Sequence, residues 1–294
     1  MKSTDRLELR TLAFALLATL LLWNLPVGGV LLYPFKLLAT WLHESSHGLA
    51  MILTGVGFDH VHIFRDTSGL AYGTNEAGAF GSAVIAAAGY MGTPLWGAVL
   101  LVVTPNARMA RWALLLLAAL LICTAVTVLG TPDGDVFGPW AIGAMGAACA
   151  VAALIVPGRW RLVIAHFIAA QSCVNAILDI RVLLRPSQVV GGRIAGASDA
   201  ANMADATFGT TAPWAIWAWA IVWLLWSLAV LYIALRLSGS RALGHLVPFA
   251  RATETRASRL PPRWAVATRV RSRRSAPRAR PARRWRRRRG PGSP

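Results

Sequence analysis

Long uncharged stretches dominate this 294-residue chain and restrict what it can fold into. They cover residues 11–35, 77–107, 112–132, 136–158 and 206–235. Each reaches the roughly 20 residues that a helix needs to cross the hydrocarbon core of a bilayer. Hydrophobic residues make up 56% of the chain and charged residues only 14%, a composition that excludes an ordinary soluble domain.

Two further apolar segments, residues 37–53 and 162–184, contain ionisable side chains. Because a helix satisfies its own backbone hydrogen bonds inside lipid, we predict an all-α polytopic integral membrane protein with six or seven membrane segments. Its membrane-embedded domain should cover residues 1–242. The Ala- and Arg-rich composition favours a bacterial source, and with it the plasma membrane.

The end of the chain, residues 243–294, has a different composition and is expected to be a disordered tail. Residues 251–294 hold sixteen Arg and one Glu, which supply +15 of the formal net charge of +18. Such a tail has too few apolar residues to form a core, and its charge attracts anionic lipid headgroups. Nucleic-acid binding would depend on charge alone, since Trp264 and Trp285 are the only aromatic residues of 251–294 for stacking on bases. We therefore expect lipid, and not nucleic acid, as its partner.

The most specific motif is His-Glu-Ser-Ser-His at residues 43–47, inside an apolar segment. On a helix, His43 and His47 lie one turn apart on the same face, a spacing typical of zinc ligands, and Glu44 is the matching general base. The alternative is a pair of helical histidines whose polar atoms are satisfied by neighbours. Ionisable groups are costly in a membrane segment, so the motif favours the metal site.

The residues after this motif indicate a short β-hairpin. Residues 58–64 alternate imperfectly between apolar and polar, residues 65–69 carry a turn signal, and residues 70–74 follow as a second strand. An edge strand of this kind could hold an extended peptide by strand addition.

A polar stripe inside segment 162–184 supplies a candidate third ligand. Gln171, Asn175 and Asp179 are spaced four residues apart, so they share one helix face and should point into the protein. Asp179 either binds the zinc or pairs with Arg181 or Arg185 at the membrane boundary. In residues 185–211, a polar linker, Ser198 is suited to cap a helix because acidic Asp199 follows it.

Several of these segments together resemble the M50B-like metallopeptidases, relatives of the site-2 intramembrane proteases. The resemblance covers residues 35–235 and includes residues 43–47, Thr54-Gly55 with the hairpin, Ala-Gly-Tyr-Met-Gly at 88–92, Ser-Asp-Ala at 198–200 and a Trp-rich last helix. It implies a zinc site, a membrane-embedded hairpin and peptide-bond hydrolysis. Site-2 proteases take a third ligand from a later Asp that follows an Asn, and Asn175 and Asp179 match that pattern without its Pro and Gly.

On this interpretation the chain is an intramembrane zinc metallopeptidase that cuts membrane-protein or peptide substrates. His43, His47 and Asp179 bind Zn²⁺, and Glu44 takes a proton from the attacking water and passes it to the leaving amine. Asn175 orients the carbonyl or stabilises the oxyanion. The alternatives are a non-catalytic pseudoprotease or scaffold that binds transmembrane clients, and a small transporter that uses the polar stripe.

Overall fold

The described part of the chain is a helical unit that carries two small β-hairpins. The computed structural model describes residues 25–183 and 187–244. Most of the first predicted segment, residues 11–24, and the Arg-rich tail from residue 245 lie outside these ranges. The helices are α2 (Pro26–Leu53), α3 (Ala79–Val103), α4 (Ala107–Thr127), α5 (Phe137–Leu154), α6 (Gly158–Leu183), α7 (Asp199–Phe208) and α8 (Pro213–Gly244), and the strands are β1 (Phe58–Ile63), β2 (Gly69–Gly73), β3 (Ser187–Val190) and β4 (Arg193–Ala197).

The prediction of a polytopic α-helical membrane protein is confirmed. Among the described residues, α3, α4, α5, α6 and α8 are long and apolar enough to span a bilayer. Large apolar side chains lie on their outer surfaces, with Trp112 61% exposed and Leu116 63% exposed on α4. Water would penalise such surfaces, whereas lipid tails solvate them. The chain is an integral, multi-pass membrane protein.

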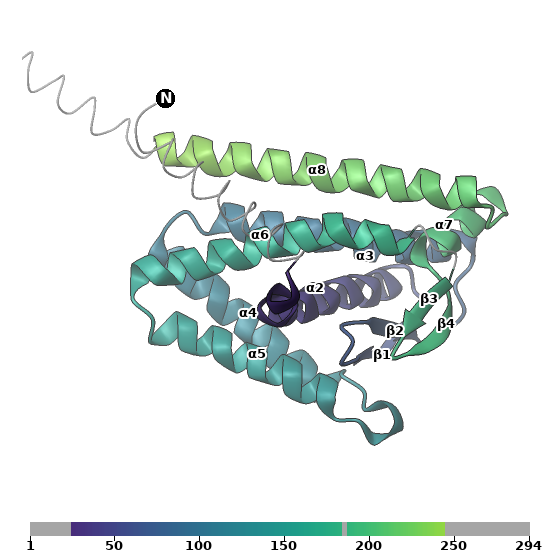
Figure 1. Ribbon diagram of the computed structural model, residues 1–294, viewed down its shortest axis with the longest axis horizontal. Helices are drawn as coiled ribbons and strands as arrows, with labels where there is room; N and C mark the ends of the chain where they lie inside the picture. Colours follow the sequence, from purple (N-terminus) through teal and green to yellow (C-terminus); the bar gives the residue numbers. More distant parts are fainter. Residues whose placement is uncertain (1–24, 184–186, 245–294) are drawn as a thin grey trace, which may run out of the picture. The chain divides into compact units, whose positions relative to one another are not determined.

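The helices form two groups that share α2. In one group α3, α6 and α8 lie side by side, and in the other α4 packs along α5 (Figure 1). The helix α2 contacts α3 and α6 and also the first hairpin. Its Leu38 and Trp41 belong to a buried cluster with Leu114 of α4 and Ile142 of α5, and Trp41 donates a hydrogen bond to Thr124 at 2.9 Å. The core thus fixes the helix that carries the His-Glu-Ser-Ser-His motif.

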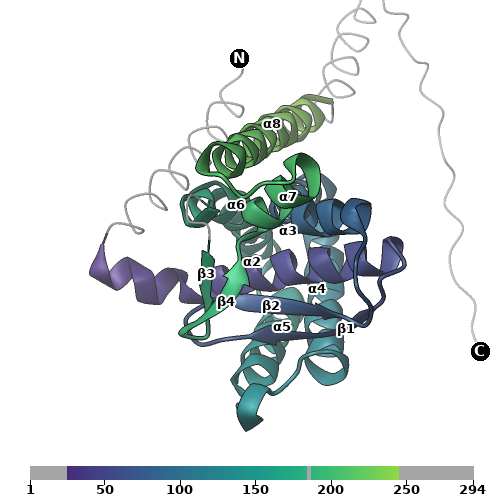
Figure 2. The ribbon, with the colours of Figure 1, turned by 90° about the vertical axis from the view of Figure 1, so that its right-hand side faces the viewer.

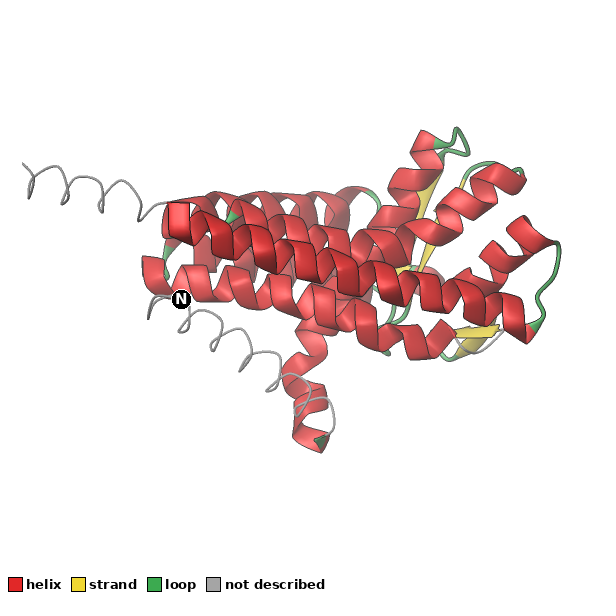
Figure 3. Ribbon diagram, turned by 90° about the horizontal axis from the view of Figure 1, so that it is seen from above, coloured by secondary structure: helices red, strands yellow, loops and turns green. Residues whose placement is uncertain are grey.

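The two hairpins lie toward one end of the long helices, where Figure 3 draws the strands in yellow. The strand β4 of the second hairpin leads into α7 and contacts it (Figure 2). The predicted hairpin after the motif is confirmed as β1 paired antiparallel with β2, with Val61 opposite Ala71. The outer edge of β1 is also engaged, because Val61 bonds the backbones of Val128 and Gly130, each at 2.9 Å. The other edge of β2 has no strand partner among the described residues.

The segment expected to be a polar linker is structured instead. It forms the hairpin β3–β4 and the short helix α7. Gly191 and Gly192 make the tight turn of this hairpin with φ values of +57° and +77°, a conformation that glycine adopts at little cost. The predicted helix cap at Ser198 is present, since its hydroxyl accepts a hydrogen bond from the Ala201 amide at 3.2 Å. The paired glycines thus indicated a hairpin in the sequence, but the polar composition of the segment suggested a linker.

Two predicted boundaries also differ. The uncharged segment 11–35 and the motif segment 37–53 were expected to be separate, but α2 is continuous from Pro26 through Lys36 to Leu53. A single lysine does not end a helix, because its long side chain can reach a polar region. At the other end α8 continues to Gly244, two residues into the predicted tail.

The α4–α5 interface provides a test of this packing. A side chain at Gly146 would lie 2.7 Å from Ile122 and 3.1 Å from the Ala118 carbonyl, whereas one at Gly143 would meet only Ala125, at 3.8 Å. We expect Gly146→Val to lower the free energy of unfolding by about 1–3 kcal/mol through overpacking. Gly143→Ala should leave the free energy of unfolding unchanged or raise it, because alanine has a higher helix propensity than glycine. Thermal unfolding in detergent micelles measures both, and equal effects of the two variants would contradict the interface.

Candidate metal centre

The two histidines of the motif meet on the inner face of α2. One helical turn apart, they bring their Nε2 atoms to 3.0 Å from each other. Their side chains are 19% exposed for His43 and 8% for His47, so both are largely withdrawn from the surroundings. Two such groups in an apolar bundle need a compensating partner.

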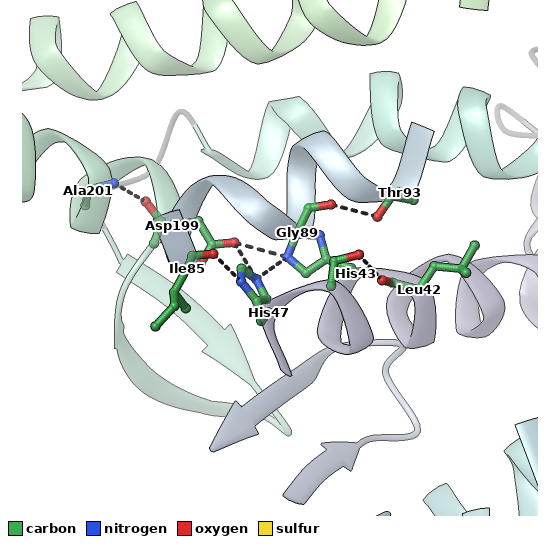
Figure 4. A network of polar contacts seen from close by, with 10 residues as sticks. Leu42, His43, His47, Ile85, Gly89, Thr93, Asp199 and Ala201 are labelled. Carbon is green, nitrogen blue, oxygen red and sulfur yellow. Dashed lines mark hydrogen bonds and ion pairs between the residues drawn. The ribbon is translucent and has the colours of Figure 1, made fainter. Parts of the chain in front are cut away.

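That partner is Asp199, which sequence analysis did not select. Its Oδ2 atom lies 3.0 Å from His43 Nε2 and 3.4 Å from His47 Nε2 (Figure 4). Asp199 is the first residue of α7, where the helix dipole stabilises an anion. Burial raises the pKa of Asp199, but the charge of His47 and the hydrogen bonds from both imidazoles outweigh burial and lower it overall. Among the described residues, these three form the group able to hold a metal ion.

A hydrogen bond outside the group orients His47. Its Nδ1 atom lies 2.7 Å from the backbone carbonyl of Ile85 on α3. A carbonyl only accepts, so the neutral ring carries its proton on Nδ1 and turns the lone pair of Nε2 toward His43 and Asp199. Metal-binding histidines typically have this second contact, which fixes the tautomer and the ring orientation.

Small residues on α3 allow this approach. A Cβ atom at Gly89 would overlap the imidazoles of both His43 and His47, and one at Gly92 would overlap Ser46. The α3 backbone therefore lies directly against the motif face of α2, the kind of contact that small residues permit between membrane helices. This helix also supplies Ile85 and the next residue of interest, Tyr90.

Tyr90 supports His43 from the other side. Its ring meets the His43 imidazole edge to face, with the centroids 4.7 Å apart, and stacks on buried Trp223 of α8 at 5.2 Å. Aromatic contacts of this kind stabilise a ring in one orientation. The sequence placed Tyr90 in the Ala-Gly-Tyr-Met-Gly segment that resembles the family, but indicated no contact between its ring and the histidines.

Glu44 lies next to the histidines, between α2 and the first hairpin. It is buried, and the backbone of Ala71 in β2 offers its carboxylate a hydrogen bond. A side chain at Gly69 would lie 2.6 Å from Glu44 Cγ, so glycine is what lets β2 come this close. The strand and the carboxylate are thus in direct contact.

A cavity of about 310 Å³ opens onto this carboxylate. His43, Glu44, Tyr90, Asp179 and Val190 are among the residues that line it. Its walls come from α2, α3, α6, the β1–β2 turn and β3, so the second hairpin also borders it. We call this space the Glu44 cavity.

The polar stripe of α6 lies inside the protein, but not as expected. Asp179 lines the Glu44 cavity, yet the ligand group contains Asp199 in its place. The physical reason is that the β3–β4 hairpin returns the chain and sets the start of α7 against α3, over the histidines. Asn175 is buried, and its amide nitrogen donates to the Phe35 carbonyl at 3.1 Å. The side chains of Arg181 and Arg185, the alternative partners of Asp179, are outside the described set.

The donor set fits zinc. Zinc–ligand bonds of 2.0–2.2 Å in a tetrahedral arrangement place ligand atoms about 3.3 Å apart. The three separations here are 3.0, 3.0 and 3.4 Å. Two imidazole nitrogens and a carboxylate oxygen are also the ligand types that catalytic zinc sites use, with one position left open.

Fold and site together define a multi-pass membrane protein with a group of three possible metal ligands, two of them on an HExxH helix. Residues 12–234 match the family model described as Peptidase M50B-like. The chain belongs to this family, as the motifs predicted. No curated protein and no solved structure matches it.

The close approach of α3 gives a prediction. We expect Gly89→Ala to displace the histidines and sharply reduce the Zn²⁺ bound per chain, measured by elemental analysis of detergent-purified protein. Gly81→Ala on the same helix is the control, because its Cβ would make only ordinary contacts, 3.5 Å or longer. Full zinc occupancy in Gly89→Ala would show that the histidines do not depend on this contact.

Proposed function

We propose that this protein is an intramembrane zinc metallopeptidase that hydrolyses peptide bonds of membrane-protein substrates. The observation that carries the proposal is the convergence of His43, His47 and Asp199 beside Glu44 and a cavity. Family membership supports the reaction class, and the spanning helices support a site close to the bilayer.

In this proposal His43 and His47 hold zinc through Nε2 and Asp199 holds it through Oδ2. The distances above support Asp199 over Asp179 as the third ligand, because Oδ2 lies within 3.4 Å of both imidazoles. Zinc in such a site acts as a Lewis acid and makes a water molecule more acidic.

Glu44 is the proposed general base. Its carboxylate accepts a proton from the attacking water and later donates it to the nitrogen of the leaving amine. Burial keeps bulk water from competing for the carboxylate, and the contact with β2 holds it in place. Asn175 was predicted to orient the substrate carbonyl or stabilise the oxyanion. Its amide nitrogen already donates to the Phe35 carbonyl, which argues against this role.

The position of β2 supports extended binding of the substrate. A transmembrane helix shields its amides in intrahelical bonds, so a segment must unwind before it can be cut. The edge of β2 without a strand partner among the described residues runs past Glu44, and it could pair with such a segment.

The ligand set predicts different zinc contents for two matched carboxylate variants. We expect about one zinc per chain in the parent, little in Asp199→Ala and nearly the parental amount in Asp179→Ala. Elemental analysis after removal of excess metal measures this. Loss of zinc in Asp179→Ala but not in Asp199→Ala would reverse the assignment, and no zinc in the parent would refute the metallopeptidase.

Glu44 separates a peptidase from a non-catalytic scaffold. We expect Glu44→Gln to keep its zinc and to lose roughly 10²–10⁴-fold in cleavage rate, the usual contribution of a general base. A proteome-derived peptide library, read by mass spectrometry, measures cleavage of many sequences at once, so the substrate need not be identified first. Zinc-loaded parent that cuts nothing above the Glu44→Gln background would favour the scaffold.

A further inference from the structure

A second cavity adjoins the metal centre. It has a volume of about 600 Å³ and is lined by Asp199 but not by His43 or Glu44, which line the first cavity. The ligand group therefore lies between the two spaces. We call the second space the Asp205 cavity, after the exposed carboxylate on its α7 wall.

The strand β2 connects the two cavities. Gly69, its first residue, lines the Glu44 cavity, and Gly73, its last, lines the Asp205 cavity. Gly69 lies against the Glu44 side chain, and the backbone of Ala71, midway along the strand, offers the hydrogen bond to the Glu44 carboxylate. At about 3.3 Å per residue, the four steps from Gly69 to Gly73 span roughly 13 Å. A peptide paired with β2 would place its reacting bond near Glu44 and a side chain about two residues away in the Asp205 cavity.

The Asp205 cavity differs from the first in its chemistry. Met51, Val56 and Ile85 provide an apolar base, while Asn202 and Asp205 provide polar groups. Asp199, Asn202 and Asp205 are three residues apart along α7, so they lie on one side of it. The charged residues that line this cavity are both carboxylates, whereas Lys36 accompanies the carboxylates of the Glu44 cavity.

Asp205 is free to take part in recognition. It is exposed near the end of α7, and among the described residues its side chain makes no hydrogen bond or ion pair. Asp199 differs, because its charge is already shared with two imidazoles. Asp205 is thus the carboxylate whose charge is available to an incoming side chain.

We propose that the Asp205 cavity is a substrate subsite that receives one flank of the extended peptide and, through Asp205 and Asn202, selects basic or hydrogen-bonding side chains there. The inference rests on the proposed peptidase function and adds a substrate class to it: segments with a basic residue about two positions from the cut bond. Three observations indicate a substrate peptide as the occupant. The cavity adjoins the proposed zinc ligands, β2 runs into it from the Glu44 cavity, and its charged lining residues are carboxylates.

The test compares peptides that differ only in flank charge. Two pairs of fluorescent twelve-residue peptides carry Lys-Lys or Glu-Glu, one pair on the amino side and one on the carboxyl side of a central Ala-Leu bond. Their affinity for zinc-loaded, full-length Glu44→Gln protein is measured by fluorescence anisotropy. Their kcat/KM is measured with the Glu44-containing chain. A partly exposed ion pair predicts a preference of roughly threefold for lysine within one of the two pairs.

The variants are Asp205→Lys and its matched control Glu76→Lys. Glu76 is an exposed carboxylate in the loop beside the cavity but does not line it, so its reversal alters local charge and leaves the subsite intact. A lysine near the end of a helix suits the helix dipole, and Asp205→Lys should therefore fold. We expect Asp205→Lys to reverse the flank preference and Glu76→Lys to preserve it.

The outcomes separate the subsite from the peptidase. An Asp205-dependent preference in binding, without cleavage of any peptide, would favour the non-catalytic scaffold and support the Asp205 cavity as its peptide-binding site. Cleavage with a preference that is the same in the parent and in Asp205→Lys would support the peptidase and overturn the subsite. An equal change of flank preference in Asp205→Lys and Glu76→Lys would also overturn the subsite, because the preference would then come from long-range charge.

Discussion

Inside an apolar bundle, the carboxylate of Asp199 contacts the imidazoles of His43 and His47, and the rest of the structure depends on this contact. Ionisable groups in such surroundings lose their hydration, so each is stable only if the others compensate it. The fold provides the compensation by holding α7 against α3, directly over the motif face of α2. The Ile85 carbonyl completes it by binding the far nitrogen of His47. A metal ion in this group would replace the direct contacts between the three donors by bonds to a common centre.

Close helix packing makes this geometry possible. Gly89 leaves room for both imidazoles, and Gly69 lets β2 reach Glu44. Larger side chains at either position would push the walls apart by more than the tolerance of a metal or proton-transfer site. At these two positions glycine matters because it has no side chain. Its backbone freedom is not needed there, since neither residue has a positive φ. One cavity is lined by His43 and Glu44 and the other by Asp199, so the group of possible metal ligands lies between them.

Much of the fold could be predicted because its signals are local. Uncharged runs predicted the spanning helices α3, α4, α5 and α8, and the apolar segment 162–184 predicted α6. Alternation with a turn signal predicted the β1–β2 hairpin. The motif at residues 43–47 identified the helix of the site. The β3–β4 hairpin was missed because its strands are short and its residues mostly polar or small, so composition resembled that of a linker. Its paired turn glycines, Gly191 and Gly192, were the signal that could have revealed it.

The sequence by itself determined the class of protein and the helix that carries the His-Glu-Ser-Ser-His motif, since hydropathy and helical spacing act over a few residues. Only the tertiary structure decided the third member of the metal group. Asp179 has the better local pattern, but Asp199, 156 positions from His43, is the carboxylate that reaches the histidines. The β3–β4 hairpin, which lies between α6 and α7 in the chain, makes the difference, because the chain leaving it brings Asp199 to the histidines of α2. No periodicity along one helix carries such information, since the contact joins segments whose separation in sequence says nothing of their distance in space.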